Sequence, residues 1–225
     1  SLMEAMKLLI SIVERGKGAA MQKLYRSRQV LLHLQCPGMG TATSEIMDIL
    51  GLGSSEKDMV FSFTTAWGAD RLLYDLDNDL RGTVNTSGLV FTVPISGLSN
   101  MVANLAAYPL ENQKRTNGGE EQMERTEDSL IVVACNRGCT DDVMATAKKA
   151  GARGGTVIKA RLAGLEEMEK AYDLDLMEEK EIVLIVVPTE LRNPLMESLN
   201  AEHGLRTHSQ SILCSLPIEQ IVRLG

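Results

Sequence analysis

An internal repeat is the feature that most constrains the fold of this chain. The segment from Lys7 to Met101 returns in degenerate form from Ser129 to Val222. Both copies close on a similar phrase, GLVFTVPI at residues 88–95 and SILCSLPI at residues 211–218. A second pair of phrases lies upstream, LGSSEKDMVF from residue 52 and LMEEKEIVL from residue 176. Because an internal repeat determines the architecture of a chain, this one indicates a duplicated domain.

The repeat predicts two domains joined by a linker. Residues 5–108 form the first predicted domain and residues 129–225 the second. The predicted linker, residues 109–128, is polar, contains glycine and is poor in apolar side chains, a composition typical of flexible segments. Any site formed between such domains is expected either twice or in two unequal versions.

Composition excludes several classes of function. The 225 residues are 44% hydrophobic and carry a formal net charge of −7, so broad electrostatic binding to nucleic acid or to an anionic membrane is not expected. The sequence has no apolar run of the roughly 18 to 20 residues that cross a bilayer and no secretory signal peptide. We therefore expect a cytoplasmic protein that is not integral to a membrane.

The cysteines and histidines give no metal-site or redox signature. They lack CxxC and HExxH spacing, so free thiols in a reducing compartment are expected and a metal site is not. The residues concerned are Cys36, Cys135, Cys139 and Cys214, and His33, His203 and His208.

Short runs of branched apolar residues alternate with segments of helical spacing in both halves. Strands are predicted at residues 7–13, 30–36, 59–64 and 89–95, and again at 130–134, 156–161, 182–187 and 212–216; helices are predicted at 19–28, 69–80, 140–150 and 193–202. Pro37 and the glycines at 38 and 40 are expected to end the second strand, and residues 41–55 to be irregular or partly helical.

The order βαββαβ in each half predicts an α+β fold of two tandem ferredoxin-like domains, each with both helices on one face of its sheet. The other face would then carry apolar side chains without a cover, and we expect the domains to associate through it.

Four phrases in this order resemble the PII nitrogen-regulatory signalling proteins. They are GARGGTVIKAR at residues 151–161, LPIEQIVR at 216–223, the glycine pair Gly38 and Gly40, and the strand from Gly88 to Pro94. The resemblance covers nearly the whole chain as two copies. It implies a trimer of ferredoxin-like units that holds ATP or ADP in clefts between neighbours. It also implies flexible loops that contact a transporter or an enzyme, often with 2-oxoglutarate sensed through the bound nucleotide.

The family's site residues are only partly present in each half. The glycines at the base of the long T-loop are present in the first half, but the second keeps only Gly164, with Leu162 at the other place. The glycine-rich phosphate-binding B-loop is reduced to Ser87 and Gly88 in the first half and to SQS at residues 209–211 in the second. Of the two arginines after the last strand, only Arg223 remains.

Neither half therefore carries a complete nucleotide site. Either the halves complement one another, combining Gly38, Gly40 and Gly88 with Arg223, or the ligand has changed or been lost. Glycine would allow close approach of backbone amides to phosphate, and arginine would bind phosphate in a bidentate way. The candidate residues for a bound ATP, ADP or AMP are Gly38, Gly40, Gly88, Arg161, Gly164 and Arg223. The alternative is plain turn chemistry for the glycines and a solvated side chain for Arg223.

Three functions compete at this point. The first is a non-catalytic regulator of the PII type, a homo-oligomer of three chains that controls an unidentified enzyme or transporter, with nitrogen metabolism as the implied setting. The second is an enzyme, against which stands the lack of any nucleophile and base motif. The third is a structural or metal-tolerance trimer resembling CutA, for which His33 and Cys36 would bind copper.

Overall fold

The computed structural model describes residues 5–41, 56–95, 107, 127–162, 169–170 and 173–224. They form a mixed α/β structure that divides into two compact units. Unit 1 comprises Ser1–Pro37, Lys57–Glu127 and Pro217–Gly225, and unit 2 comprises Gly38–Glu56 and Asp128–Leu216. No helix among the described residues is long and apolar enough to cross a membrane.

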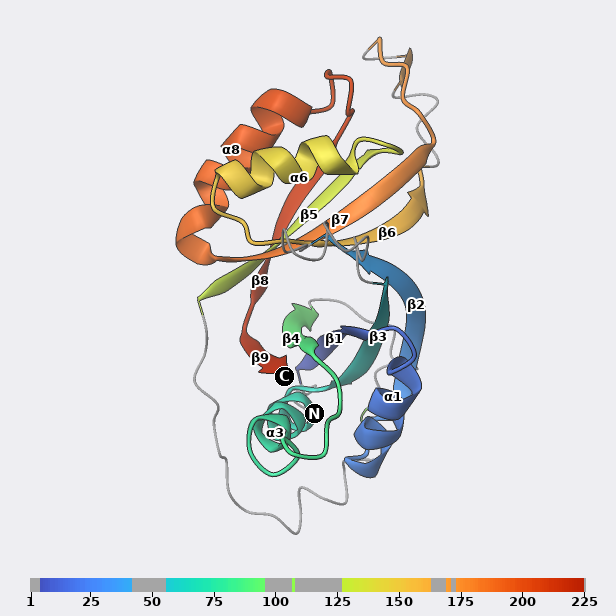
Figure 1. The fold of residues 1–225 in the computed structure, drawn as a ribbon, viewed down its shortest axis with the longest axis vertical. Helices are drawn as coiled ribbons and strands as arrows, with labels where there is room; N and C mark the ends of the chain where they lie inside the picture. Colours follow the sequence, from blue (N-terminus) through green and yellow to red (C-terminus); the bar gives the residue numbers. More distant parts are fainter. Residues whose placement is uncertain are drawn as a thin grey trace, which may run out of the picture. The chain divides into compact units, whose positions relative to one another are not determined.

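Unit 1 is a sheet with the strand order β2-β3-β1-β4-β9 (Figure 1). β1 pairs antiparallel with both β3 and β4, and β4 pairs antiparallel with β9. The elements are β1 (Met6–Glu14), α1 (Gly18–Ser27), β2 (Leu32–Gly40), β3 (Glu56–Thr65), α3 (Ala66–Asp77), β4 (Gly88–Ile95) and β9 (Gln220–Leu224).

The helices α1 and α3 pack on the same face of the sheet of unit 1. Met21 and Tyr25 of α1, one helical turn apart, are buried with Leu72 and Leu76 of α3, which have the same spacing. Residues at i and i+4 share a helix face, so each helix presents one apolar stripe to the sheet. These stripes pack against buried residues on one face of the strands, which are Leu9 and Val13 of β1, Val90 of β4 and Val222 of β9.

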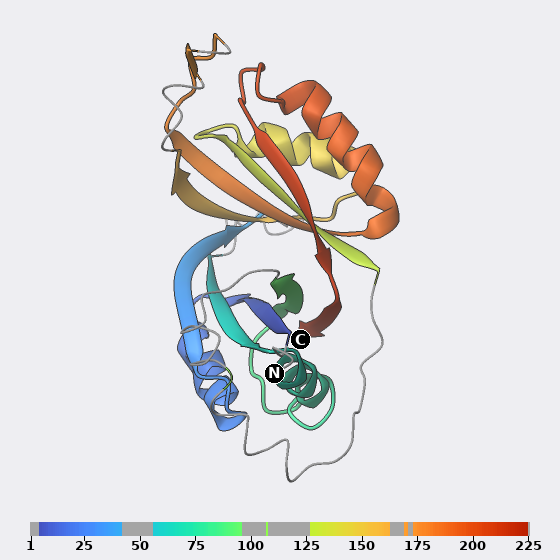
Figure 2. The same cartoon turned by 180° about the vertical axis from the view of Figure 1, so that it is seen from behind.

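Unit 2 repeats this architecture with the strand order β8-β5-β7-β6, followed by the end of β2. α6 and α8 lie side by side over one face of this sheet, as Figures 1 and 2 show from opposite sides. The elements are β5 (Asp128–Asn136), α6 (Thr140–Lys149), β6 (Thr156–Arg161), β7 (Glu179–Pro188), α8 (Thr189–His203) and β8 (Ile212–Ile218).

The core of unit 2 follows the same rules. Val143 and Ala147 of α6 and Leu195 and Leu199 of α8 are buried at helical spacing. They pack on alternating strand residues, which are Ile131, Val133, Cys135, Val183, Ile185 and Val187. The predicted element order βαββαβ is therefore present in both halves of the sequence.

The last strand of the chain does not belong to the unit that precedes it in sequence. β9 pairs with β4 of unit 1, in a register that places Val222 opposite Val90 and Arg223 opposite Leu89. The side chain of Val222 is 3% exposed and joins the core of unit 1. The last strand predicted from the sequence is residues 212–216, so β9 was not predicted, because Pro217 and Glu219 interrupt the apolar pattern.

The second strand is longer than predicted. The pattern PGMG at residues 37–40 was expected to end it, yet β2 runs through Gly40. Beyond Pro37 the strand pairs with β6 of unit 2, with Met39 opposite Val157 and Gly40 opposite Thr156. Loss of one amide donor at Pro37 is tolerated because a new partner strand takes up the pairing after it.

The second helix of unit 2 begins at Thr189 and not at Asn193, and Pro194 lies inside it. Proline is unfavourable in a helix interior because it lacks an amide donor, so the sequence favoured a later start. Several predicted regions lie outside the described residues. They are the irregular segment at residues 42–55, the part of the predicted linker from residue 109 to residue 126, and residue 225. The predicted domain boundaries stay predictions.

Truncation of Val222 tests the assignment of β9 to unit 1. Val222→Ala leaves a cavity among residues of β1, β4 and α3, and we expect it to lower the free energy of unfolding by about 2 kcal/mol. Hydrogen exchange measured by mass spectrometry should be faster in peptides from β1 and β4. Val187→Ala, at a valine of unit 2 that is 1% exposed, should act on β5 and β7. Faster exchange of β5 and β7 in Val222→Ala, with β1 and β4 unaffected, would contradict the assignment.

Candidate functional site

A cluster of polar contacts lies at one end of the sheet of unit 1. The turn from β1 into α1 meets the start of β3 there, and the loop at residues 83–87 leads into β4 at the same end. Gly16 in the first turn has φ +87°, a conformation that glycine adopts without strain. Thr86 in the second loop donates to the carboxylate of Glu14 and accepts from the Glu14 amide, each at 3.3 Å.

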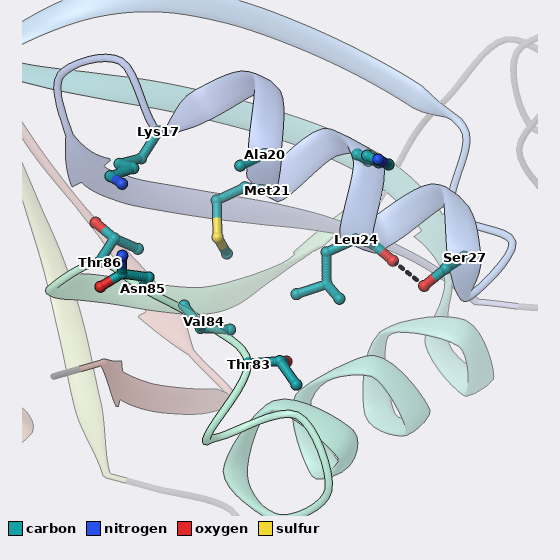
Figure 3. A pocket seen from close by; sticks show the side chains of 10 residues that line it. Lys17, Ala20, Met21, Leu24, Ser27, Thr83, Val84, Asn85 and Thr86 are labelled. Atoms are coloured by element: carbon teal, nitrogen blue, oxygen red, sulfur yellow. Dashed lines mark hydrogen bonds between the residues drawn. The ribbon is translucent and has the colours of Figure 1, made fainter.

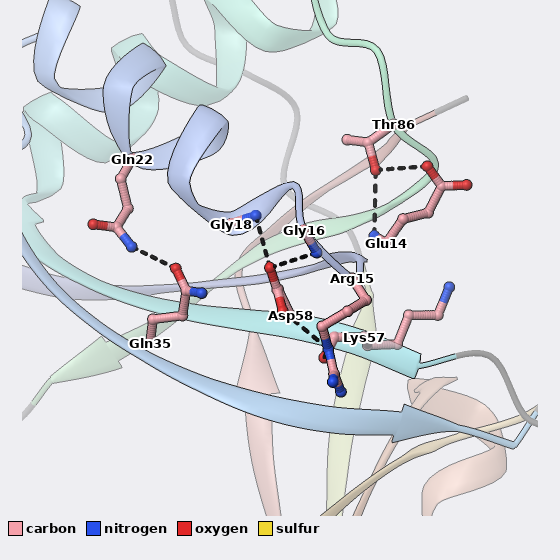
Figure 4. Close-up of polar contacts among 9 residues, drawn as sticks. All are labelled: Glu14, Arg15, Gly16, Gly18, Gln22, Gln35, Lys57, Asp58 and Thr86. Carbon is pink, nitrogen blue, oxygen red and sulfur yellow. Dashed lines mark hydrogen bonds and ion pairs between the residues drawn. The ribbon is translucent and has the colours of Figure 1, made fainter.

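A buried carboxylate, that of Asp58, accepts hydrogen bonds from backbone amides of the first turn (Figure 4). Oδ2 of Asp58, a residue that is 5% exposed, accepts hydrogen bonds from the amides of Gly16 and Gly18 at 3.0 Å each. The guanidinium of Arg15 lies 3.1 Å from the other oxygen of Asp58. Because Asp58 satisfies these two amides, neither is available to a phosphate or carboxylate ligand.

Unit 2 has a related but more exposed arrangement. Gly138, with φ +90°, donates its amide to Oε1 of Glu181 at 2.8 Å, and Arg137 contacts Glu179 at 3.0 Å. The positions correspond in register, since Asp58 lies opposite Val13 in one sheet and Glu181 lies opposite Cys135 in the other. Sequence analysis aligned the phrases that contain Asp58 and Glu181 but assigned neither carboxylate a role.

A groove of about 370 Å³ lies between α1 and residues 83–86 of the loop (Figure 3). Its lining combines an apolar strip with lysines, hydroxyl groups and an amide. The lining residues are Lys17, Ala20, Met21, Lys23, Leu24, Ser27, Thr83, Val84, Asn85 and Thr86. Sequence analysis did not find this groove, because its residues are conventional helix-surface and loop residues.

Two of the predicted site residues, Gly88 and Arg223, are brought together in unit 1. Gly88 begins β4 and lies opposite Val13 on one side and Leu224 on the other, so the strand residue next to Arg223 is its partner. Its φ is +151°, and a Cβ at this position would lie 2.0 Å from the carbonyl oxygen of Ile12. The side chain of Arg223 is exposed.

The other predicted residues are not gathered around this pair within unit 1. Gly38 and Gly40 lie in the part of β2 that belongs to unit 2, where Gly40 pairs with Thr156. Arg161 is at the opposite end of β6, where its backbone lies opposite that of Glu179 of β7. Arg161 lies five positions along β6 from Thr156, a distance of about 16 Å. Gly164 lies outside the described residues.

In unit 2 the loop before β8, the counterpart of residues 83–87, is held by a buried lysine. The Lys180 ammonium, on a residue that is 3% exposed, donates to Oδ1 of Asn136 at 2.7 Å and to the carbonyl of Gln210 at 3.1 Å. Burial lowers the pKa of Lys180 below its usual range, although the nearby thiols of Cys135 and Cys139 act in the opposite direction. These contacts fix the loop, and sequence analysis did not anticipate them.

The cysteines and histidines form no metal cluster among the described residues. His33 and Cys36, the residues considered for copper, are three positions apart on β2 and so point to opposite faces of the strand. Nδ1 of His33 is instead 2.8 Å from the hydroxyl of Ser62. All four cysteines are free thiols.

Comparison with known proteins adds little to this picture. No family model matches the chain, and no curated protein matches it. The chain is similar to a solved structure described as a PII-like signalling protein, from Thermus thermophilus, with 18% identity and a TM-score of 0.33. The match covers 45% of this chain and 92% of the other. A similarity of this size carries no weight for fold or function.

Substitution of Gly88 tests the close approach of β4 to β1. Gly88→Ala forces a methyl group against the Ile12 carbonyl in a backbone conformation that alanine avoids, so we expect a loss of about 3 kcal/mol or more in unfolding free energy. Urea denaturation measures it. Gly82→Ala is the matched control, since a Cβ there has no atom within 4 Å, and it should change stability by less than about 0.5 kcal/mol. Equal stability of the two variants would show that the strands do not approach as described.

His33 gives the chain a pH dependence. Burial lowers the pKa of His33 below 6.5, with the nearby Arg26 charge acting in the same direction, so the unfolded chain binds the proton more readily. Stability should therefore fall as the pH drops below about 6.5, with a slope under the roughly 1.4 kcal/mol per pH unit that one proton allows. His33→Gln should reduce this slope in urea titrations between pH 7.5 and 5. An unchanged slope would assign the dependence to other groups.

Proposed function

We propose that the chain is a non-catalytic regulatory protein of the PII type, which binds a small anion such as ATP, ADP or AMP and controls a partner protein. One observation carries the proposal. β9 brings Arg223, from the second half of the sequence, beside Gly88, from the first half. Neither half has a complete set of phosphate-binding residues, and this pairing supports the idea that the halves complement one another.

The chemistry of this pair suits a phosphate group. The exposed Arg223 guanidinium can donate two parallel hydrogen bonds to phosphate oxygens. Gly88 allows β4 to approach β1 closely, because a Cβ there would meet the Ile12 carbonyl, and so it holds the strand that pairs with β9. Arg223 lies opposite Leu89 and next to Val222, whose side chain enters the core under α3. Because neighbouring strand residues point to opposite faces, Arg223 lies on the face of the sheet away from the helices. Gly38, Gly40, Arg161 and Gly164 stay predicted site residues.

We further propose that each unit is a ferredoxin-like domain and that the two arose by duplication. The strand orders β4-β1-β3-β2 and β8-β5-β7-β6 correspond position by position. The Arg15-Gly16 turn with Asp58 and the Arg137-Gly138 turn with Glu181 support this, because unrelated domains would not be expected to share such a detail.

Association of three chains through the sheets would complete such a regulator. Ile212 and Leu216, on the strand β8, are 43% and 39% exposed. They alternate with Leu213, which packs toward the helices, and so lie on the other face of the sheet. Exposed apolar residues on a sheet face favour a partner surface. We propose a cytoplasmic homotrimer whose target is an enzyme or a transporter, with nitrogen metabolism as the setting that the sequence resemblance implies.

We propose a non-catalytic protein because the polar cluster that most resembles catalytic residues, that around His203, is buried and closed to substrate. His203 contacts Ser209 through Nδ1 at 2.9 Å and Thr146 through Nε2 at 2.7 Å. His203 is only 7% exposed and Ser209 only 5%. This arrangement supports a structural role, in which the histidine holds the loop at residues 204–211 against α6.

Thermal unfolding with nucleotides tests the proposed function. A ligand that binds only the folded protein raises Tm by mass action, so ATP, ADP or AMP should raise the Tm of the full chain, with or without 2-oxoglutarate. Arg223→Ala should weaken the binding by about 10-fold or more, the loss typical of a charge-assisted contact. Arg153→Ala, at an exposed arginine outside this region, should bind as the wild type does.

Light scattering of the same samples should give the mass of three chains. Absence of any Tm shift with nucleotide at several millimolar would overturn the nucleotide part of the proposal. Equal weakening by Arg153→Ala and Arg223→Ala would remove the proposed site, since it would show that only net charge matters.

A further inference from the structure

We propose that the groove between α1 and residues 83–86 is a second binding site, which takes a small organic anion with an apolar body. It goes beyond the proposed nucleotide site, which depends on Arg223. The groove is lined by α1, on the helix-covered face of unit 1, whereas Arg223 lies on the other face of the sheet. The two sites can therefore be tested separately.

The middle of the groove is apolar. The side chain of Met21 is 3% exposed and those of Leu24 and Val84 are half-buried, and Figure 3 shows all three directed into the same space. An apolar strip with few converging polar groups is the usual composition of a small-molecule site, and the volume of about 370 Å³ falls in the usual range for such sites. An aliphatic chain or a single aromatic ring would remove this strip from water.

One end of the groove carries the ammonium group of Lys17. The ammonium of Lys17 points toward the side chains of Asn85 and Thr86 (Figure 3), and Lys23 also belongs to the lining. Among the described residues neither lysine forms an ion pair, although other basic residues of unit 1 do, such as Arg15 with Asp58. None of the ten lining residues is acidic. The carboxylate of Glu14 accepts hydrogen bonds from the hydroxyls of Thr86 and Ser87 in the adjoining loop.

These observations define the chemistry of the ligand. A carboxylate or phosphate group would lie between the Lys17 ammonium and the amide of Asn85, and its apolar body would lie along Met21, Leu24 and Val84. The hydroxyl of Thr83 at the other end could bond a polar group there, because its present acceptor is only the local Leu80 carbonyl. The charge selects anions, and the apolar strip selects against small inorganic ones.

Two substitutions on α1 form a matched test. Ala20 lines the groove and the neighbouring Ala19 does not, and both are exposed residues in the first turn of the helix. A glutamate in the first turn favours the helix, so Ala20→Glu and Ala19→Glu should both fold. Only Ala20→Glu puts a carboxylate into the groove, where it would repel an anion and compete for Lys17.

The experiment measures binding of 3-phenylpropanoate to the full chain by amide chemical shifts in ¹H–¹⁵N spectra, with 3-phenylpropanamide as the neutral analogue. Saturable shifts are expected for Met21, Leu24 and Val84 with the anion, and weaker ones with the amide. Lys17→Gln and Ala20→Glu should each raise Kd by about 10-fold. Ala19→Glu and Lys149→Gln, which removes an exposed lysine of α6, should stay within 2-fold of the wild type.

The proposal is overturned if no saturable shifts appear at these residues, if the neutral amide binds as well as the anion, or if Ala20→Glu binds like Ala19→Glu. Arg223→Ala keeps the two proposals apart. The Arg223→Ala variant should bind 3-phenylpropanoate as the wild type does, even though its binding of nucleotides is weakened. If this variant loses the binding of 3-phenylpropanoate as well, the groove is not a separate site.

Discussion

The pairing of β9 with β4 is the interaction on which the rest of unit 1 depends. β4 has β1 on one side, and without β9 its other side would be an open edge with unpaired amides and carbonyls, a known liability of sheets. β9 closes that edge and adds Val222 to the core beneath α3. The same register sets Arg223 beside the first residues of β4, so the architecture and the proposed ligand site follow from one set of backbone hydrogen bonds.

Most of the secondary structure could be predicted from the sequence. Strands such as β6 and β7 are dense in branched apolar residues, and helices such as α6 have clear turn signals on both sides, so local pattern was sufficient. It failed where a partner distant in sequence decides the outcome. β2 extends past Pro37 because β6 is there to pair with Met39 and Gly40, and β9 exists because β4 offers it an edge. No local pattern contains that information.

The candidate sites were harder to predict for a related reason. Asp58 resembles any charged residue near the start of a strand, and only the fold shows that its carboxylate fills the amides of the Gly16 turn. The groove draws on one helix face and one loop whose residues are ordinary in the sequence. Lys180 resembles a solvent lysine in a charged run until its ammonium is seen inside a polar network. Glycine and arginine phrases located only the Gly88 and Arg223 pair.

The placement of β9 also orders events during synthesis. A ribosome makes β1 to β4 first and β9 only after every strand of unit 2. Domains generally fold as units while the chain emerges, but the sheet of unit 1 cannot be completed until β9 has been made, after the strands of unit 2. During synthesis, one edge of β4 therefore stays unpaired while unit 2 is made. A chaperone that binds unpaired strand edges would then act on unit 1, although unit 1 is the first to be synthesised.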